Sequence, residues 1–449
     1  MDRSDSEISR RNALRKGGIA IAGSVVGLSS ASTTAVAEPT EIAECGEYRA
    51  GEYVLTEDIS TTGGCLSLEG DVTLDGNGHT ISGDGTGVGI SMGEGTVEIT
   101  NLNLDDFGTG IRISTLGTIY EAELTVRDTI ISNTSAAISG NYRPRITLQD
   151  SELRDNGTGI SGGEAARVSI RQSTISGHDG QAVFTDLGNF IGVENSVIED
   201  NGAGIDVGQG TITDSTIADN DGYGIKLIGL VAPADVGETT LVGNDIQNNS
   251  GAGILFKASN GTVRENTIAD NQNGVVISYD YSFGGFPDRY EFINNNIENN
   301  AEFGIHNRID EFPTVDLEDT GVPDATCNYW GDPTGPQNEN NPNENPQGDR
   351  VSDNVEFGPW SVTEIQDGEG TCLGGNPIGD FQSQPTDPDG DGLYEDINGD
   401  GESDIVDVQA LFSNSDDETV QNNPDAFDFN DDGSVDVVDV QKLFTELSE

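Results

Sequence analysis

A short sequence pattern recurs about every 22 residues through the middle of the chain. Each copy has an aliphatic residue, two further residues, an Asn, and another Ile or Val four or five residues later. The first clear copies run from Ile130 through Asn133 to Ile138 and from Leu153 through Asn156 to Ile160. A unit this short cannot bury its own apolar face, so successive units must stack on one another as a solenoid.

Within each unit, apolar and polar residues alternate over short runs rich in Ile, Val and Thr, and Asn, Asp and Gly interrupt the runs. These are strand and turn signals. Strands that stack at a fixed period run parallel, and crossovers between parallel strands are right-handed. The predicted fold class is therefore an all-β solenoid, a right-handed parallel β-helix.

The recurrent Asn side chains are expected to form a ladder in which each amide bonds to the next coil. Phe107 and His178 fall on this ladder in place of Asn. The expected ladder positions are Phe107, Asn133, Asn156, His178, Asn201, Asn220, Asn249, Asn271 and Asn300.

The chain carries 80 acidic and 20 basic residues, a formal net charge of −60 at pH 7. In dilute salt such a charge strains a compact fold by self-repulsion, whereas molar salt screens it to within about 3 Å. The composition therefore predicts an extreme halophile as the host. Nucleic acid and anionic membrane surfaces are disfavoured as partners, because both would be repelled by this chain.

The N-terminal segment has the features of an export signal. Residues 9–15 (SRRNALR) resemble a twin-arginine signal, an apolar stretch follows over residues 17–28, and residues 35–37 (AVA) form a candidate cleavage site. The apolar stretch is too short and too rich in Gly and Ser for a membrane span. We expect a secreted protein, exported by the twin-arginine pathway, whose mature chain begins near Glu38 and has no membrane span.

Four cysteines in an exported chain predict two disulfides. Cys45 and Cys65 are close to one coil apart and are expected to meet on adjacent coils. Cys327 and Cys372 flank the other end of the repeat region. Each pair would staple an exposed end of the solenoid, where unpaired strands invite aggregation.

Both ends of the repeat region carry motifs of a known family. Residues 51–59 (GEYVLTEDI) and 72–81 (VTLDGNGHTI) resemble the opening coils of the right-handed β-helix proteins related to NosD, and residues 327–336 (CNYWGDPTGP) are similar to their closing motif. The resemblance implies the same fold over roughly Cys45 to Trp360. That fold class includes polysaccharide lyases, hydrolases, epimerases, adhesins and copper-maturation factors.

Copper handling does not fit the residues of this chain. It has three histidines, His79, His178 and His306, and two methionines, and it shows no cluster of soft ligands. His79 lies in the family's turn motif and His178 lies on the ladder, so we expect structural roles for both.

Beyond the repeats, two copies of a calcium-loop pattern lie 32 residues apart. Calcium takes six to eight hard oxygen ligands, which such a loop supplies from positions 1, 3, 5, 7, 9 and 12, and Gly at position 6 permits the tight turn. The expected calcium ligands are Asp396, Asn398, Asp400, Glu402, Asp404 and Asp407 in the first loop and Asp428, Asn430, Asp432, Ser434, Asp436 and Asp439 in the second.

An upstream acidic run resembles a third, overlapping calcium repeat. Its candidate ligands are Asp387, Asp389 and Asp391. The alternative for this run is an acidic linker that binds no metal.

Each main loop runs into a short apolar helix, expected over residues 406–412 and 438–444. This paired layout, with Asp at position 12, resembles the dockerin module, which docks proteins onto cohesin domains. The resemblance implies a small α-helical calcium-loop domain and a cohesin-like protein partner. The predicted organisation is a signal peptide over residues 1–37, the β-helix over 38–374, a linker over 375–386 and the dockerin-like domain over 387–449.

The three longest coils carry their extra residues after the Gly-Ile strand, over residues 114–123, 228–240 and 279–290. Insertions at one point of a repeat emerge along one edge, where they can wall a groove. The last of them bears several aromatic residues, which offer sugars an apolar platform: Tyr279, Tyr281, Phe283, Phe286 and Tyr290.

A mixed cluster of charges is expected beside this aromatic loop. His306, Arg308 and Asp310 are two residues apart and therefore share the outward face of the last strand. Alignment of the coils puts Asp280 beside Asp310 and Lys257 near Arg308. Uronate lyases need such a mixture, in which a cation neutralises the sugar carboxylate and a base removes the adjacent proton. These five residues are the catalytic candidates; the alternative is a solvated face whose opposite charges pair across coils.

The sequence thus predicts a secreted or cell-surface β-helix protein that binds a glycan or surface polymer and carries a calcium-loaded, dockerin-like tail for attachment to a protein. One alternative is a polysaccharide lyase or glycoside hydrolase that uses the face around His306. Another is a purely structural surface protein. Product formation distinguishes the enzyme from both other classes.

Overall fold

The computed structural model describes residues 38–115, 122–185, 189–228, 239–257, 259–279, 290–312, 320–341, 343, 345–366, 378–379, 381, 385, 393–400, 403–430 and 432–448. The expected signal peptide and most of the expected linker lie outside these residues. No helix among the described residues is long and apolar enough to cross a membrane.

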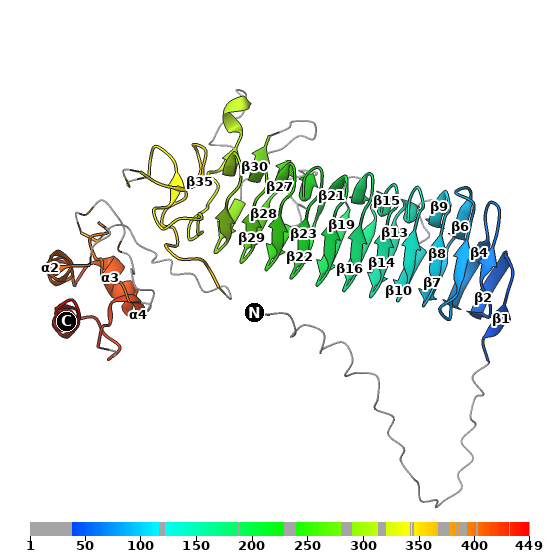
Figure 1. Ribbon diagram of the computed structural model, residues 1–449, viewed down its shortest axis with the longest axis horizontal. Coiled ribbons are helices and arrows are strands. Elements are labelled where there is room, and N and C mark those ends of the chain that lie inside the picture. The colour runs from blue at the N-terminus through cyan, green and yellow to red at the C-terminus, as the bar shows by residue number, and fades with distance from the viewer. Residues whose placement is uncertain are drawn as a thin grey trace, which may run out of the picture. The chain divides into compact units, whose positions relative to one another are not determined.

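The repeats form the predicted parallel β-helix, in which each full coil contributes one strand to each of three faces (Figure 1). Face 1 contains β7 (Gly95–Thr100), β10 (Ala122–Arg127), β13 (Pro144–Gln149), β16 (Arg167–Arg171), β19 (Phe190–Glu194), β22 (Gln209–Thr213), β25 (Thr239–Val242), β28 (Gly261–Arg264) and β31 (Tyr290–Ile293). Every pairing within it is parallel, as a solenoid of fixed hand requires.

Face 2 is an eleven-stranded sheet of short strands. It contains β3 (Ile59–Ser60), β5 (Thr80–Ser82), β8 (Asn103–Asp105), β11 (Ile130–Ser132), β14 (Glu152–Arg154), β17 (Thr174–Ser176), β20 (Val197–Glu199), β23 (Thr216–Ala218), β26 (Asp245–Gln247), β29 (Thr267–Ala269) and β32 (Asn296–Glu298). The middle residue of each three-residue strand is a fully buried aliphatic: Ile81, Leu104, Ile131, Leu153, Ile175, Ile198, Ile217, Ile246, Ile268 and Ile297. Burial of each such side chain stabilises the fold by about 1.5–3 kcal/mol, which explains why every coil carries an aliphatic residue at this position.

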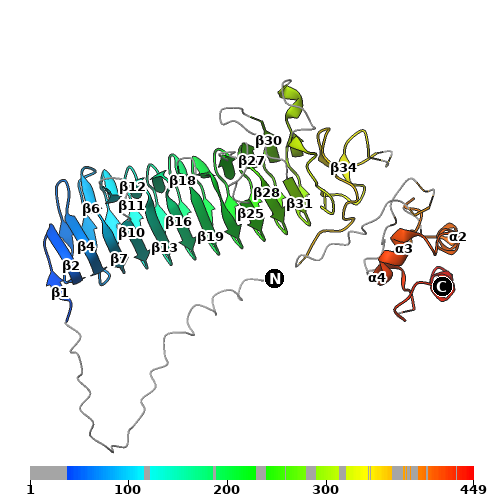
Figure 2. The same ribbon diagram turned by 180° about the vertical axis from the view of Figure 1, so that it is seen from behind.

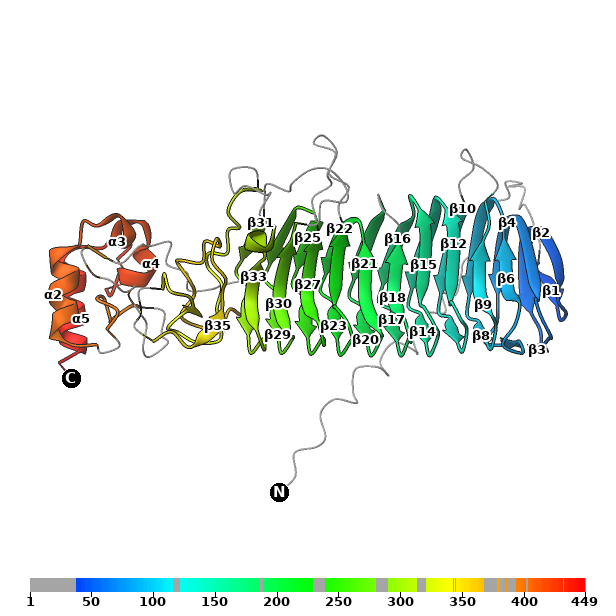
Figure 3. The ribbon, with the colours of Figure 1, turned by 90° about the horizontal axis from the view of Figure 1, so that it is seen from above.

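Face 3 completes each coil, as seen from behind in Figure 2 and from above in Figure 3. It contains β6 (Val88–Met92), β9 (Thr109–Ile113), β12 (Ile138–Tyr142), β15 (Ile160–Glu164), β18 (Gln181–Thr185), β21 (Ala203–Val207), β24 (Ile225–Ile228), β27 (Ala252–Lys257), β30 (Asn273–Ser278) and β33 (Phe303–Asn307). The long connections leave the coil between face 3 and face 1, as the coil lengths predict, and most of their residues lie outside the described part of the chain.

The first coils are built differently. After β1 (Thr40–Ile42), the ten-residue strands β2 (Gly46–Leu55) and β4 (Leu66–Asp75) pair with each other, and β4 pairs with both β6 and β7, so it serves two faces. The expected disulfide joins Cys45 to Cys65 across these coils, with Cα atoms 4.5 Å apart. Cys327 is also in a disulfide, and its expected partner, Cys372, lies outside the described residues.

The Asn ladder is present, with one error in the prediction. From Asn201 to Asn300 each side-chain oxygen accepts the backbone N–H of the preceding ladder residue, as in Asn201 N–H to Asn220 Oδ1 at 3.2 Å. The rung assigned to Asn133 is occupied by Thr134, whose N–H and hydroxyl both bond Asn156 Oδ1. Asn133 is exposed and adopts φ +55°, because the turn places a left-handed residue immediately before each rung.

A second ladder, which the sequence analysis missed, follows the turn between faces 1 and 2. Ser151, Ser173, Ser196 and Ser215 bond one another through hydroxyl and backbone N–H, and Asn residues continue the series. The ladder runs Thr129, Ser151, Ser173, Ser196, Ser215, Asn244, Asn266, Asn295 and Asn328. Two buried polar ladders therefore satisfy the two tight turns of each coil, whose backbone groups have no strand partner.

His178 occupies its rung as a neutral imidazole. Its ring Nδ1 accepts the backbone N–H of Asn156. The backbone N–H of His178 donates to Asn201 Oδ1, and only 2% of the residue is exposed. Burial lowers its pKa from 6.5 to about 4, because the charged form is poorly solvated there.

This buried imidazole predicts an acid-sensitive step in stability. A pKa lower in the folded than in the unfolded state gives stability that is complete above pH 6.5 and is lost as the pH falls toward 4, by at most about 3 kcal/mol. We expect His178→Asn to remove this loss. The variant-minus-wild-type difference in unfolding free energy should therefore be more favourable to the variant at pH 4.5 than at pH 7. His79→Asn keeps the buried ring and should keep the loss. Equal differences at both pH values for His178→Asn would contradict the assignment.

The C-terminal tail contains α2 (Ile405–Ser413), α3 (Glu418–Asn422), α4 (Pro424–Phe427) and α5 (Val437–Glu446). The expected helices over residues 406–412 and 438–444 fall within α2 and α5, which pack against each other. Asp404 and Asp436 cap them in the same way, each accepting a backbone N–H two residues on at 2.7 Å. The sequence duplication is therefore also a structural one.

Candidate functional site

A cavity near the predicted cluster lies where the last full coil meets the closing segment. This segment contributes η2 (Ile309–Glu311), β34 (Pro336–Gln337) and β35 (Gly348–Arg350), and Val351 bridges to Ile305 of β33 as a further rung. The cavity, here called the end cavity, has a volume of about 440 Å³. It is lined by Phe303, His306, Asn307, Arg308, Asp310, Glu311, Gln337, Asn338, Glu339, Arg350, Val351, Ser352 and Asp353.

Two arginines bring positive charge to the end cavity from different elements. Arg308 precedes η2, and its Nε donates to Glu311 Oε1 at 2.9 Å while its terminal nitrogen pairs with the other oxygen. Arg350, at the end of β35, lies over the ring of Phe303 with its guanidinium carbon 4.5 Å from the ring centre. One guanidinium is therefore held by a carboxylate and the other by a cation–π contact.

His306 is close enough to both arginines for their charges to act on its imidazole. Its ring stacks on Phe303 with centres 4.2 Å apart and planes 14° from parallel. Burial lowers the pKa of His306, and Arg308 lowers it further, while Glu311 and Glu302 act in the opposite direction. The imidazole is thus biased toward its neutral form, the form that accepts a proton.

The end of the Asn ladder closes beneath this cavity. Asp349 takes the final rung, where its Oδ2 accepts both the backbone N–H and the side-chain amide of Asn300 at 3.0 and 2.8 Å. Burial raises the pKa of Asp349 to about 6, partly offset by those hydrogen bonds. The ladder therefore fixes the backbone of β35 from which Arg350 projects.

The structure brings three of the five catalytic candidates together. His306, Arg308 and Asp310 line the end cavity. Lys257 lies on β27, where it pairs in register with Ser278, and it is not among the described residues that line the cavity. Asp280 lies outside the described residues.

Sequence reasoning missed the closing segment's share of the cavity. Arg350, Gln337 and Ser352 come from residues without the repeat, so alignment of coils assigns them no neighbour. The scarcity of basic residues, 20 in the whole chain, is the one signal that singles out Arg350.

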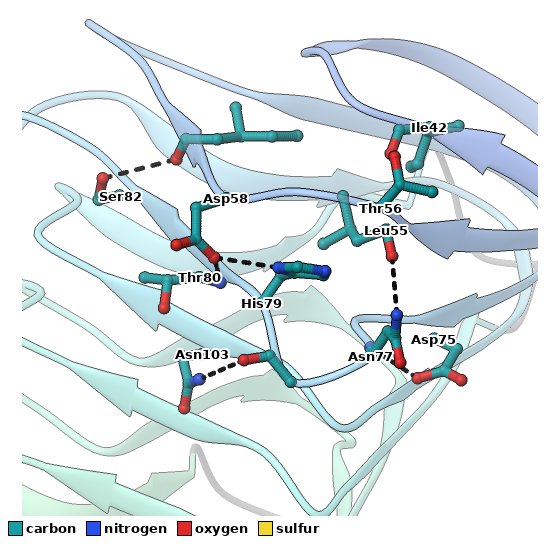
Figure 4. Close-up of polar contacts among 12 residues, drawn as sticks. Ile42, Leu55, Thr56, Asp58, Asp75, Asn77, His79, Thr80, Ser82 and Asn103 are labelled. Atoms are coloured by element: carbon teal, nitrogen blue, oxygen red, sulfur yellow. Dashed lines mark hydrogen bonds and ion pairs between the residues drawn. The ribbon is translucent and has the colours of Figure 1, made fainter.

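The opening coils use their histidine differently (Figure 4). His79 Nδ1 lies 3.2 Å from Asp58 Oδ1, which also accepts the N–H of Thr80 at 2.9 Å, and Asn77 Nδ2 bonds Leu55 O. These contacts link two successive coils. His79 therefore acts as a structural residue of the turn.

The two predicted calcium loops in the tail fold alike. Asp407 Oδ1 accepts the N–H of Asn398 at 3.1 Å and its Oδ2 that of Asp404 at 2.8 Å. Asp439 makes the equivalent bonds to Asn430 and Asp436, at 3.1 and 2.7 Å. The twelfth residue of each loop thus ties positions 3 and 9 together.

Three of the carboxylates of these loops are buried in the described structure. Asp396, Asp407 and Asp439 are fully buried, and burial raises the pKa of both Asp407 and Asp439. Within the described residues, which omit Glu402, Asp387, Asp389 and Asp391, no group of three or more His, Cys, Asp or Glu side chains is already arranged to hold a metal ion.

The fold and this end cavity define a right-handed parallel β-helix protein with a charged, partly aromatic site at its carboxyl end. The sequence matches the family described as right handed beta helix region over residues 86–236 and 231–314, and the chain belongs to that family. No curated protein matches it.

This chain is similar to solved structures of mannuronan C-5 epimerases. The A-module of mannuronan C-5 epimerase AlgE6 from Azotobacter vinelandii is 16% identical, with a TM-score of 0.51 over 71% of this chain and 92% of that one. The A-module of epimerase AlgE4 from the same organism is 16% identical, with a TM-score of 0.45 over 60% and 83%. At this identity the likeness describes the fold alone.

Proposed function

We propose that this protein is an exported β-helix protein that binds an acidic polysaccharide in the end cavity. The observation that carries the proposal is the convergence of Arg308, Arg350 and the Phe303 ring in one cavity of about 440 Å³. Guanidinium groups bind carboxylates through paired hydrogen bonds, and an aromatic ring gives a sugar an apolar surface. The A-module of epimerase AlgE6, which shares the fold and whose name specifies mannuronan, supports this class of ligand.

The test compares the mature chain with an Arg308→Gln, Arg350→Gln variant on a panel of labelled uronate and neutral polysaccharides in molar salt. We expect uronate binding to weaken by roughly tenfold or more, because charge-assisted hydrogen bonds are lost. Arg49→Gln, Arg171→Gln removes the same charge from ion pairs elsewhere and serves as the matched control. Unchanged binding in the cavity variant, or no uronate binding by the wild type, would refute the proposal.

A second candidate function is cleavage or epimerisation of the same polymer, favoured by the lowered pKa of His306. Arg308 or Arg350 would neutralise the uronate carboxylate, and neutral His306 would take the proton from the adjacent carbon. In a lyase, the electron pair of that C–H bond would form the new double bond as the glycosidic oxygen leaves. Formation of unsaturated ends that His306→Gln abolishes, with binding retained, would establish an enzyme.

We further propose that the tail is a calcium-binding, dockerin-like module that attaches the protein to a cohesin-like partner. Its two loops supply matching hard oxygen ligands, with Asp396 and Asp428 at position 1. The exposed apolar residues are also duplicated, which offers a partner two equivalent surfaces: Ile405 and Val437, Val406 and Val438, and Phe412 and Phe444. Twin-arginine export and adaptation to molar salt complete the proposal.

A further inference from the structure

Three of the chain's 20 basic residues gather at a second surface cavity on the middle coils. Arg143, Arg145 and Arg167, here called the arginine cluster, line a cavity of about 310 Å³ together with Ala165. Arg145 lies on β13 and Arg167 on β16, neighbouring strands of face 1, and Arg143 lies at the corner where the chain enters β13. In a protein with net charge −60, three arginines at one cavity are a local concentration of positive charge.

The register makes the cluster unusual on this β-helix. Arg145 is directly opposite Arg167 on adjacent parallel strands, about 4.8 Å apart at the backbone. Like charges at such positions destabilise a sheet. At two other positions an arginine is opposite a carboxylate on the adjacent coil and forms an ion pair with it, Arg49 with Glu69 and Arg171 with Glu194.

The ion pairs found in the described part of the chain do not extend to Arg143 or Arg167, and both side chains are exposed. Arg145 is half-buried and faces Glu123 on its other side. The guanidinium groups of Arg143 and Arg167 therefore face solvent and do not form ion pairs between the described coils.

Two aromatic rings lie beside the cluster. The guanidinium carbon of Arg143 lies 5.4 Å from the centre of the Tyr142 ring. Phe190 of β19 pairs in register with Arg167, and 41% of it is exposed. A column of Arg145, Arg167 and Phe190 thus runs across three coils, with a charge, a charge and an apolar ring at successive rungs.

We propose that the arginine cluster is a second anion-binding site, which takes the carboxylate or sulfate groups of an acidic polysaccharide whose sugar rings rest on Phe190. One coil advances the column by about 4.8 Å, a step comparable to one pyranose unit, so successive acidic sugars meet successive arginines. The site is five to six coils from the end cavity, about 25–30 Å along the rod, and stands independently of the function proposed there.

The test is a calorimetric titration with short oligosaccharides, which cannot span both sites. Trigalacturonate and a sulfated trisaccharide are titrated separately into the mature chain in about 1 M salt, where repulsion by the rest of the surface is screened to about 3 Å. The two ligands distinguish carboxylate from sulfate as the group recognised. Arg143→Gln, Arg145→Gln, Arg167→Gln is compared with Arg49→Gln, Arg154→Gln, Arg171→Gln, which removes equal charge from ion-paired arginines.

We expect the cluster variant to lose one bound oligosaccharide per chain, whereas the control variant keeps it. If the end cavity does not bind the oligosaccharide, no binding event will be sensitive to Arg308→Gln, whatever the arginine cluster does. Failure of the proposed function and failure of this proposal are therefore distinguishable. Equal stoichiometry in the wild type and the cluster variant, or equal weakening in both triple variants, would overturn the proposal. If the triple variant does not fold, Arg167→Gln alone should weaken the same binding event by roughly tenfold, and an unchanged affinity would overturn it.

Discussion

Asn249→Leu is expected to destabilise the β-helix by about 4 kcal/mol, among the largest effects of any single substitution in the rod. Asn249 Oδ1 accepts from the backbone and side-chain amides of Asn220, and its Nδ2 donates to Ile217 O and Asn271 Oδ1. Leucine has a similar volume but makes no hydrogen bonds, so these buried polar groups are left unsatisfied. The rungs on both sides of Asn249 each lose a hydrogen-bond partner. Urea unfolding in molar salt, followed by circular dichroism, measures the change.

The neighbouring residue provides the control. Asn248 is exposed and adopts φ +56°, a conformation that glycine reaches freely, so Asn248→Gly should change stability by less than about 1 kcal/mol. If Asn249→Leu also costs less than about 1 kcal/mol, the ladder amides contribute no net stability and the apolar stack alone holds the coils.

Chelation of calcium is expected to open the tail to protease while the β-helix remains intact, if the tail binds calcium as proposed. Each occupied site stabilises the folded tail by about 3 kcal/mol when free calcium is about 100-fold above Kd. Limited proteolysis with and without chelator, read by mass spectrometry, locates the cuts. An unchanged digestion pattern would contradict the proposal.

A matched pair of variants separates calcium binding from charge. Asp407→Asn, Asp439→Asn weakens both twelfth positions and should make the tail protease-sensitive even with calcium present. Asp416→Asn, Glu446→Gln makes the same charge change at exposed positions outside the loops and should digest like the wild type. Equal sensitivity of both variants would mean that net charge rather than metal binding governs the tail.

The sequence predicted the coils because their signal is local and repeated. Buried aliphatics at the centre of the face 2 strands impose the pattern, and the same pattern recurs from coil to coil although the coils differ in length. The Asn133 error has a physical cause: Asn is favoured both on a rung and in the left-handed position before it, so Asn133-Thr134 reads equally well in two registers.

The second ladder shows the limit of pattern reading. Its first rungs are Ser151, Ser173 and Ser196, and serine is common on any surface of this chain, so its burial is not visible without the third dimension. The residues immediately before these rungs, Asp150, Gln172 and Asn195, all have positive φ. Polar residues therefore recur before the rungs at the ladder's own period, and this recurrence is the signal that the sequence contains.

The candidate sites depended on contacts that no repeat encodes. His306 and Arg308 could be placed together because alternate residues share a face, whereas Arg350 reaches the cavity through a closing segment whose path is irregular. The arginine cluster was encoded in the repeat, since Arg145 and Arg167 are 22 residues apart, one coil, but only the register shows that they are directly opposite.

The ladders also bear on how this rod can change over generations. Each rung bonds only within its own coil and to the coils immediately before and after it, so the energy of a coil depends on its nearest neighbours. Duplication or loss of one whole repeat preserves every rung-to-rung bond on either side of the change. The distance between the arginine cluster and the end cavity can therefore change during evolution in steps of one coil.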